Sequence, residues 1–310
     1  MISRTLGPDL VTVVITCHNH GRFLRAAVES VRRQAFADPE IIVVDDGSTD
    51  TTPDVTASLR GIRCIRQAHQ GLSAARNTGW RAARGGFVSF LDADDRLLPR
   101  ALQAGMACAA AQPSAAFVSG HYVIIDAKGV RTTDRSRPCV MSDHYRALLS
   151  SNYIGMHATV LYRRETLERH DGFDLSLPAS EDYDLYLRVA RREPVVCHPE
   201  VVAEYRWHGA NMSRNSALML STTLRVLARQ RAHVRGNPAY ETAYRGGVAF
   251  WQGLYGDLLL DEVGRRLRTG APWGVTARML GVLLRLYPLG LARRAARVTK
   301  RLSRGMVWRG

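Results

Sequence analysis

The chain has 310 residues, 46% of them hydrophobic, which is enough to bury a full core and to add a second, smaller unit. The formal net charge is +15, and residues 263–310 hold 12 Lys and Arg with no Asp or Glu, so the charge excess belongs to the C-terminal segment. The five cysteines are odd in number, widely spaced and without a CxxC pair, which argues against a disulfide framework or a zinc knuckle and favours a reducing, cytosolic setting.

Neither a secretion signal nor a membrane span is expected. The first ten residues lack a charged start followed by an apolar core and a cleavage site. The most apolar late stretch, 281–292, is interrupted by Arg285 and Pro288 and is shorter than the roughly 20 residues that a span requires.

The first third of the chain alternates between strand-like and helical segments. Residues 11–16 form a run of β-branched residues that predicts a buried strand, and apolar residues at helical spacing follow it. The alternation continues with strands at 40–44, 62–67 and 86–90 and helices at 52–59 and 72–83. This order predicts a doubly wound α/β sheet, in which ligands bind beyond the carboxyl ends of the strands. The polar clusters TCHNH, DDGSTD and LDADD lie at those ends.

The remaining segments predict two domains. After a helix at 99–111, strands are expected at 115–120, 122–129 and 158–164, and as a last pair at 195–199 and 201–208. Beyond about 215 the apolar residues recur at long helical spacing. We therefore expect a catalytic domain over 1–214 and a helical, strongly basic region over 215–310.

The acidic turn after the strand at 86–90 is a candidate metal site. Asp92 and Asp94 are two residues apart on extended backbone, so both can face the crevice. Carboxylate oxygens suit Mg²⁺ or Mn²⁺, which can bridge the phosphates of a nucleotide diphosphate. The alternative is an acidic turn that ends a strand and caps the following helix.

Two further acidic positions carry similar pairs of interpretations. Asp46, followed by Gly47 and Ser48, can meet a base and a ribose, or it can belong to an ordinary turn. Glu181 and Asp182 open a helix whose apolar stripe leaves Asp182 outside the packed face; they can also simply complement the helix dipole.

The order of the motifs resembles that of the family 2 glycosyltransferases of the GT-A fold. Across about 1–214 the chain contains TCHNHGRFL, ESVRRQAF, EIIVVDDGSTD, QGLSAARNTGWRAARGGFVSFLDADD, GFD, SEDYDLYLRVA and YRWHGANMS in that order. The resemblance implies a mixed, mostly parallel GT-A sheet and an inverting transfer of a sugar from a nucleotide diphosphate sugar, by preference a UDP-sugar, to a hydroxyl of a glycan or lipid-linked acceptor.

The resemblance also assigns nucleotide-binding residues. Thr16, Asn19 and Asp46 match positions around uracil and ribose, with His18 where the family usually has tyrosine. Arg76 matches a basic position beside the nucleotide; an ordinary solvated helix arginine is the alternative.

The metal and catalytic positions follow in the same way. Asp92 matches the carboxylate that contacts the ribose, and Asp94 matches the principal ligand of Mn²⁺ or Mg²⁺. His208 matches a histidine near the diphosphate, and we assign it to the metal site together with Asp94. Asp182 matches the general base that deprotonates the acceptor, because a sugar hydroxyl attacks only as its proton leaves. Attack opposite the diphosphate inverts the anomeric carbon.

Three residues are candidates for the acceptor side: His157, Glu181 and Trp207. Aromatic and polar side chains meet the apolar faces and the hydroxyls of sugar rings.

The basic segment 263–310 interleaves arginines with apolar and aromatic residues, as amphipathic helices on an anionic membrane surface do. Packing on the protein or on another copy, giving a homo-oligomer, is the alternative, and nucleic acid is disfavoured because no recognition motif accompanies the charge. A peripheral enzyme at the inner face of a bacterial cytoplasmic membrane is therefore expected. The rival functions are a sugar nucleotidyltransferase, which should have a Gly-rich basic loop after the first strand, and a catalytically silent nucleotide-sugar scaffold.

Overall fold

The computed structural model describes residues 7, 9–36, 38–134 and 138–294. The described residues divide into two compact units. The first unit runs to Leu148 and resumes at Asn152–Gly209; the second contains Leu149–Ser151 and the residues from Ala210 onward. The sequence predicted a boundary near 214, and the contacts divide the chain after Gly209.

The first half of unit 1 is the predicted alternation of strands and helices. Its strands are parallel in the order β3-β2-β1-β4. The elements are β1 (Val11–Cys17), α1 (Gly21–Arg32), β2 (Glu40–Asp46), α2 (Thr52–Ser58), β3 (Arg63–Gln67), α3 (Leu72–Ala82) and β4 (Phe87–Asp92). Because parallel strands share one direction, the polar residues that follow β1, β2 and β4 come to the same edge.

The second half extends this sheet with strands of both directions, so the expected mixed α/β sheet is confirmed. β8 pairs antiparallel with β4, β6 antiparallel with β8, and β9 parallel with β6. The elements are β5 (Arg96–Leu97), α4 (Ala101–Ala111), β6 (Phe117–Ile125), β7 (Arg131–Asp134), α5 (His144–Ser150), a 3₁₀ turn (His157–Thr159), β8 (Val160–Arg163), α6 (Arg164–Arg169), α7 (Glu181–Ala190) and β9 (Val196–Arg206).

In two places the structure has one strand where the sequence predicted two, and that part of the prediction is wrong. The strands expected at 115–120 and 122–129 are replaced by β6, which ends at Ile125, and the pair expected at 195–199 and 201–208 is replaced by β9, which ends at Arg206. The two strands pair with each other, and their register shifts on both sides of His121. A Cβ on Gly120 would lie 2.6 Å from the His198 ring and 2.9 Å from the Glu200 carbonyl, so the glycine admits the irregular stretch of β9 without ending β6.

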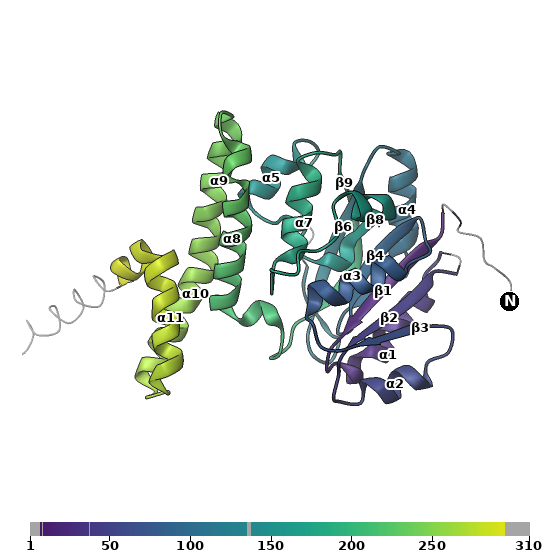
Figure 1. Cartoon of the computed structure of the whole chain (residues 1–310), viewed down its shortest axis with the longest axis horizontal. Coiled ribbons are helices and arrows are strands. Elements are labelled where there is room, and N and C mark those ends of the chain that lie inside the picture. The colour runs from purple at the N-terminus through teal and green to yellow at the C-terminus, as the bar shows by residue number, and fades with distance from the viewer. Residues whose placement is uncertain (1–6, 8, 37, 135–137, 295–310) are drawn as a thin grey trace, which may run out of the picture. The chain divides into compact units, whose positions relative to one another are not determined.

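Side chains of alternate strand residues divide between the two faces of the sheet. On one face Val11, Val13 and Ile15 join a core with residues of α1 and α4. On the other face α3 packs on β1, and Figure 1 shows α1 and α3 on opposite sides of the strands. The approach of α3 is close: a Cβ on Gly79 would lie 2.2 Å from Val14 Cγ1.

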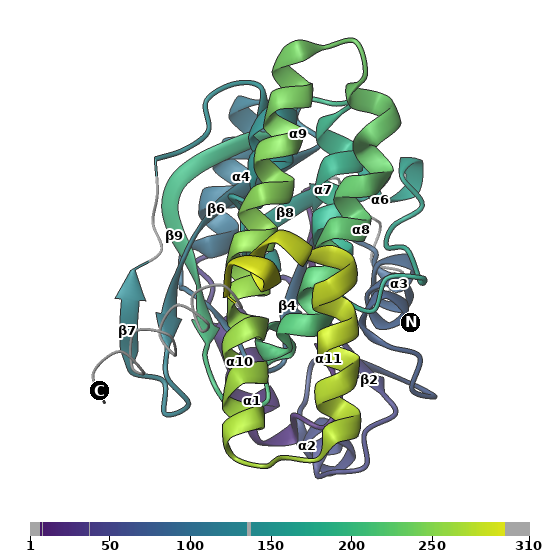
Figure 2. The ribbon, with the colours of Figure 1, turned by 90° about the vertical axis from the view of Figure 1, so that its left-hand side faces the viewer.

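Unit 2 is helical. It contains a 3₁₀ turn (Met212–Arg214), α8 (Ser216–Val234), α9 (Pro238–Trp251), a π-helical turn (Gln252–Gly256), α10 (Asp257–Arg268) and α11 (Trp273–Leu286). The π-helical turn joins α9 to α10 as one long rod (Figure 2). Leu220, Leu259, Leu260, Val263 and Leu283 form the core of this unit.

None of the described helices could by itself cross a bilayer. Trp273–Leu286 and Pro288–Arg294 have the necessary length and composition only as a pair, and they are bent by 113° at the break between them.

We predict that Gly79→Ala destabilises the protein by about 1–3 kcal/mol, because the added methyl group overpacks the contact with Val14. The matched control is Gly246→Ala on α9, where a Cβ has no neighbour within 4 Å and helix propensity favours alanine. Thermal unfolding should show a lower midpoint for Gly79→Ala and an unchanged or higher one for Gly246→Ala. Equal midpoints would contradict the close packing of α3 on β1.

Candidate active site

The carboxyl edge of the parallel strands is held in register by the sheet. Thr16 of β1 lies opposite Asp92 of β4, and Cys17 lies opposite Asp45 of β2. Thr16 Oγ1 donates a hydrogen bond of 3.0 Å to Asp92 Oδ1. The last residues of three neighbouring strands therefore form a single row of polar groups.

A buried arginine joins this row to helix α7. Arg76 lies on α3 with 2% of its surface exposed, and its guanidinium donates to Asp92 Oδ1 at 3.0 Å and to Glu181 Oε1. Arg76 was expected beside the nucleotide; the structure places it between two carboxylates of the protein. The ion pairs hold the end of β4 to the start of α7.

The acids around Arg76 outnumber its single charge. Burial raises the pKa of Glu181 to about 7, against the pull of Arg76 and with a further rise from Asp182. Burial also raises the pKa of Asp182, and Arg76 opposes that rise. The pKa of Arg76 itself is raised because Asp92, Glu181 and Asp182 together outweigh its desolvation. The carboxyl groups of Glu181 and Asp182 therefore exchange protons closer to neutral pH than ordinary carboxyl groups do.

Asp182 occupies the first turn of α7. The preceding Ser180 has a φ of 59°, a left-handed conformation that costs free energy in a residue other than glycine. Asp182 Oδ1 accepts a hydrogen bond of 2.7 Å from the backbone amide of Tyr183, and the residue is only partly buried. By contrast, Tyr183 and Tyr186 are buried, so Asp182 lies outside the packed stripe of the helix, as expected.

Asp46 organises the loop after β3. Its carboxylate accepts hydrogen bonds of 2.9 Å from the backbone amides of both Gln70 and Gly71, and one of 2.7 Å from Gln67 Nε2. His69 Nδ1 lies 2.9 Å from Asp46 Oδ2. Asp46, which we predict to contact the nucleotide, therefore fixes the shape of the loop after β3.

The loop after β1 presents two exposed residues beside Asp46. The ring of His18 stacks on the ring of His69 with a centroid distance of 4.0 Å, and His18 Nδ1 lies 2.7 Å from the Asp46 carbonyl. Asn19 has a φ of 57°, and its side-chain oxygen accepts a hydrogen bond of 2.8 Å from the Thr49 amide. The structure thus brings His18, Asn19 and Asp46 together.

Asp94 lies in a second group with two histidines. His208 Nε2 lies 2.9 Å from Asp94 Oδ2, and His20 Nδ1 lies 3.9 Å from the same oxygen. The ring of His208 stacks on Phe23 of α1 with a centroid distance of 5.4 Å. One atom from each of these three polar side chains lies within 4.8 Å of the others, as a bound cation requires.

Asp95, next to this group, is structural. Its carboxylate accepts a hydrogen bond of 2.7 Å from the Arg206 amide, and Arg206 Nε donates to the Asp94 carbonyl at 2.7 Å. Burial, then Asp94 and Asp92, raise the pKa of Asp95 well above the ordinary value. Arg206 at the end of β9 therefore sets the backbone of the acidic turn.

The acceptor candidates occupy different environments. Trp207 is 44% exposed and follows β9 directly. Glu181 belongs to the Arg76 ion pairs. His157 is 5% exposed and lies in an aromatic cluster, stacked on Phe90 at 4.9 Å, and burial lowers its pKa well below the ordinary value. His157 therefore packs in the core of unit 1, and its acceptor contact stays a prediction.

Sequence reasoning left four residues of these groups without a role: His20, His69, Arg206 and Phe23. His20 stood inside the polar cluster TCHNH, and its neighbourhood was a signal that could have been used. His69 contacts Asp46 and Arg206 contacts Asp95, each more than 20 residues away, so no local sequence pattern could predict their roles.

Comparisons with known proteins identify the family of the chain. Residues 12–171 match the family described as Glycosyl transferase family 2. The chain belongs to this family. An uncharacterized glycosyltransferase of Nostoc is 33% identical over 218 residues, which cover 67% of each chain. The putative glycosyltransferase EpsH of Bacillus subtilis is 31% identical over 169 residues, 52% of this chain and 48% of that one.

Solved structures support the same fold. S. aureus TarS 1–349 in complex with UDP has a TM-score of 0.59 at 18% identity, covering 78% of this chain and 70% of that one. The mannosyltransferase PcManGT from Pyrobaculum calidifontis, in complex with GDP-Man and Mn²⁺, has a TM-score of 0.58 at 19% identity, covering 89% and 80%. The predicted GT-A fold and family are confirmed, and the protein is a glycosyltransferase.

We predict that Arg76→Met destabilises this family 2 glycosyltransferase by about 3–5 kcal/mol near pH 8, because buried carboxylates lose their counter-charge. The loss should be smaller at pH 5. The pKa of Glu181 is about 7 when folded against 4.5 for a free side chain, so its ionisation costs stability as the pH rises through this window. Without Arg76 that cost grows.

Denaturant unfolding at pH 5 and pH 8 measures both effects. Arg81→Met is the control. Arg81 lies on the same helix, but its side chain is exposed, and its ion pair with the exposed Asp171 is long, at 3.7 Å. It should change stability by less than about 0.5 kcal/mol at either pH. A loss for Arg76→Met that is equal at both pH values would contradict the charge balance described above.

Proposed function

We propose that the enzyme is an inverting, divalent-metal-dependent transferase that moves a sugar from a UDP-sugar to a hydroxyl of a glycan or lipid-linked acceptor. The observation that carries the proposal is the separation of two acidic groups at the same sheet edge. Asp94 lies with two histidines after β4, and Asp182 lies on α7, tied to β4 through Glu181, Arg76 and Asp92. The group around Asp94 has the ligands to bind a cation, and Asp182 has a carboxylate that can accept a proton.

The residues around Asp94 fit Mn²⁺ or Mg²⁺. A carboxylate and imidazoles are ligands that Mn²⁺ accepts, and Mg²⁺ binds through one or two carboxylates together with phosphates and water. Asp94 and His208 would hold the ion, with His20 nearby. A bound ion neutralises the charge that develops on the departing diphosphate.

Asp182 would take the acceptor proton. Its raised pKa makes it a better base than an ordinary aspartate, and its backbone hydrogen bond to Tyr183 orients the carboxylate. A hydroxyl activated there attacks the anomeric carbon from the face opposite the diphosphate, and inversion follows. Glu181 would act as a positioning residue, because its carboxylate pairs with Arg76.

The nucleoside end of the donor would meet the loop after β1. The stacked rings of His18 and His69 offer a flat surface for a base, and Asn19 and Asp46 offer polar groups beside it. Thr16 and Asp92 would lie by the ribose. TarS was solved with UDP, which supports uracil as the base.

The acceptor class is supported by the exposed Trp207 and by relatives. The chain is 32% identical over 241 residues to the O-antigen biosynthesis protein RfbC of Myxococcus xanthus, covering 73% of this chain and 18% of that one. A growing glycan or a lipid-linked saccharide would supply the hydroxyl.

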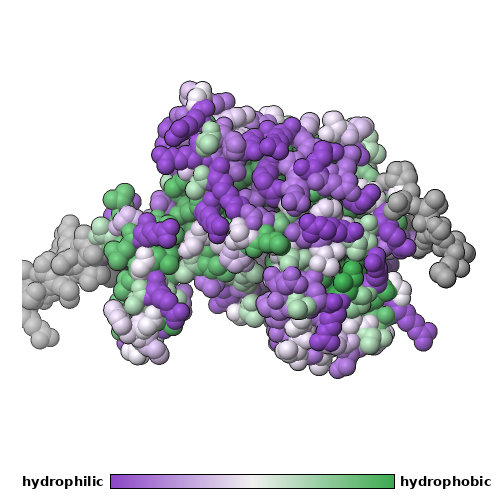
Figure 3. All heavy atoms as spheres, viewed as in Figure 1, coloured by the Kyte–Doolittle hydropathy of each residue, from purple (hydrophilic) through white to green (hydrophobic). Residues whose placement is uncertain are grey.

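The C-terminal helices would attach the enzyme to an anionic membrane surface. Large apolar residues of α10 and α11 are exposed, among them Leu267, Trp273 and Leu284, and Figure 3 shows hydrophobic and hydrophilic residues interleaved over these helices. Exposed arginines stand between them, as interfacial helices require. The part of the predicted segment over 295–310 lies outside the described residues.

We predict that Asp182→Asn lowers the transfer rate by about 10²–10⁴-fold while UDP binding in the presence of Mn²⁺ stays within about twofold, because only the base is removed. Asp171→Asn is the isosteric control at an exposed position 98% accessible in its side chain, and it should retain full activity. The assay is release of UDP from a donor panel, with calorimetry for UDP affinity. Full turnover by Asp182→Asn would eliminate it as the base.

We predict that chelation of divalent metal abolishes transfer and that Mn²⁺ or Mg²⁺ restores it. Asp94→Ala should lose metal-dependent UDP binding by at least about tenfold, because the carboxylate that would hold the ion is gone. The comparison variant is Asp54→Ala on helix α2, which should bind UDP in the presence of metal as the wild type does. Metal-independent transfer by the wild type would contradict this part of the proposal.

We predict that neutralising four exposed arginines of unit 2 weakens binding to anionic vesicles by at least about tenfold, since each basic residue contributes about 1 kcal/mol near such a surface. The changes to glutamine are at Arg265, Arg268, Arg278 and Arg285. A variant with the same charge change in unit 1 carries glutamine at Arg33, Arg60, Arg81 and Arg100. Co-sedimentation that falls equally for both variants would rule out a specific membrane surface on the C-terminal helices.

A further inference from the structure

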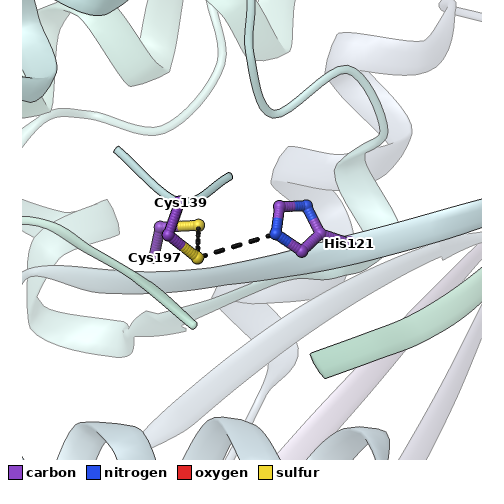
Figure 4. A group of neighbouring side chains, drawn as sticks. All are labelled: His121, Cys139 and Cys197. Atoms are coloured by element: carbon purple, nitrogen blue, oxygen red, sulfur yellow. Dashed lines mark hydrogen bonds between the residues drawn. The ribbon is translucent and has the colours of Figure 1, made fainter. Parts of the chain in front are cut away.

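A group of two cysteines and one histidine lies at strands β6 and β9 of unit 1 (Figure 4). His121 belongs to β6, Cys197 to β9, and Cys139 to the segment between β7 and α5. Cys197 Sγ donates a hydrogen bond of 2.8 Å to Cys139 Sγ, and Cys139 Sγ lies 3.6 Å from His121 Nε2. Figure 4 shows the two sulfur atoms side by side, with a ring nitrogen of His121 turned toward one of them.

This group is distinct from the active site. Strands β6 and β9 run parallel, and Ile125 and Arg206 pair at the active edge of the sheet. Cys197 instead pairs with Ser119, six strand positions earlier on β6, which corresponds to about 20 Å of extended chain. Nothing in the proposed transfer reaction uses these three side chains.

The chemistry of the three side chains is that of a soft metal site. Thiolate and imidazole ligands select Zn²⁺, whereas Mg²⁺, Mn²⁺ and Ca²⁺ prefer the oxygen ligands that this group lacks. In a tetrahedral zinc site, bonds of about 2.3 Å to sulfur and about 2.0 Å to nitrogen place S and N about 3.5 Å apart and two S atoms about 3.8 Å apart. The Cys139–His121 distance already has this value, and the two sulfur atoms need to separate by about 1 Å.

The third side chain distinguishes a metal site from a disulfide. A disulfide between Cys139 and Cys197 would need no imidazole, while an ion would use it. His121 Nε2 lies 3.6 Å from Cys139 Sγ, so the ring nitrogen is already placed to share an ion with the two sulfur atoms.

We propose that His121, Cys139 and Cys197 bind one Zn²⁺ ion, with a water molecule as the fourth ligand. Both thiols lose their protons to solvent as the ion binds, so the bound group carries two thiolates, one neutral imidazole and one divalent cation. The ion would fasten the segment between β7 and α5 to strands β6 and β9. No sequence motif indicates this group, because Cys139 and Cys197 are 58 residues apart and meet only in the fold.

The test is metal titration of the full-length, reduced and chelator-treated protein. Co²⁺ serves as the probe, because thiolate-to-cobalt absorption reports sulfur ligands and is silent for the oxygen and nitrogen ligands around Asp94. The wild type should bind one equivalent of Co²⁺ with thiolate absorption, and one equivalent of Zn²⁺ should displace it and raise the thermal midpoint. Asp94→Ala should give the same thiolate absorption.

The variants Cys139→Ser, Cys197→Ser and His121→Gln should each weaken Zn²⁺ binding by at least about tenfold. Cys64→Ser, at an exposed cysteine of β3, should bind as the wild type does. Absence of thiolate absorption in the folded wild type would overturn the proposal, and this result needs no variant to fold. A wild type that is purified with two thiols fewer than expected and no zinc would overturn it in favour of a Cys139–Cys197 disulfide.

Discussion

One buried guanidinium holds the chemical parts of this glycosyltransferase together. Arg76 is almost fully enclosed, and its ion pairs join Asp92 at the end of β4 to Glu181 at the start of α7. A buried charge is tolerated only when it is paired, so neither carboxylate can leave without a large cost. The strand that carries the acidic turn and the helix that carries Asp182 are thereby fixed to each other.

The remaining polar groups depend on the sheet edge that this pairing completes. Thr16 reaches Asp92 across two neighbouring strands, and the loop after Thr16 places His18 beside Asp46 and His20 beside Asp94. A single loop therefore touches both the group that suits a nucleoside and the group that suits a cation. In the proposed function, a donor would place its base at the first group and its diphosphate at the second.

The sequence predicted the parallel strands and the polar ends of those strands, because local periodicity and turn residues determine both. It predicted the carboxylates Asp92, Asp94 and Asp182 through their motifs, and the structure gives each a distinct environment. It could not predict that Arg76 would be enclosed by three acids, since its partners Asp92 and Glu181 are 16 and 105 residues away. The burial of His157 among Phe90, Tyr162 and Phe173 likewise arises from packing between distant segments.

The most direct measurement is a crystal structure of the enzyme with a UDP-sugar and Mn²⁺, with anomalous scattering recorded at the manganese edge. We expect one manganese peak bonded to Asp94 and His208 and to the diphosphate, with the anomeric carbon facing Asp182. A peak away from Asp94, or protein side chains between the anomeric carbon and Asp182, would contradict it.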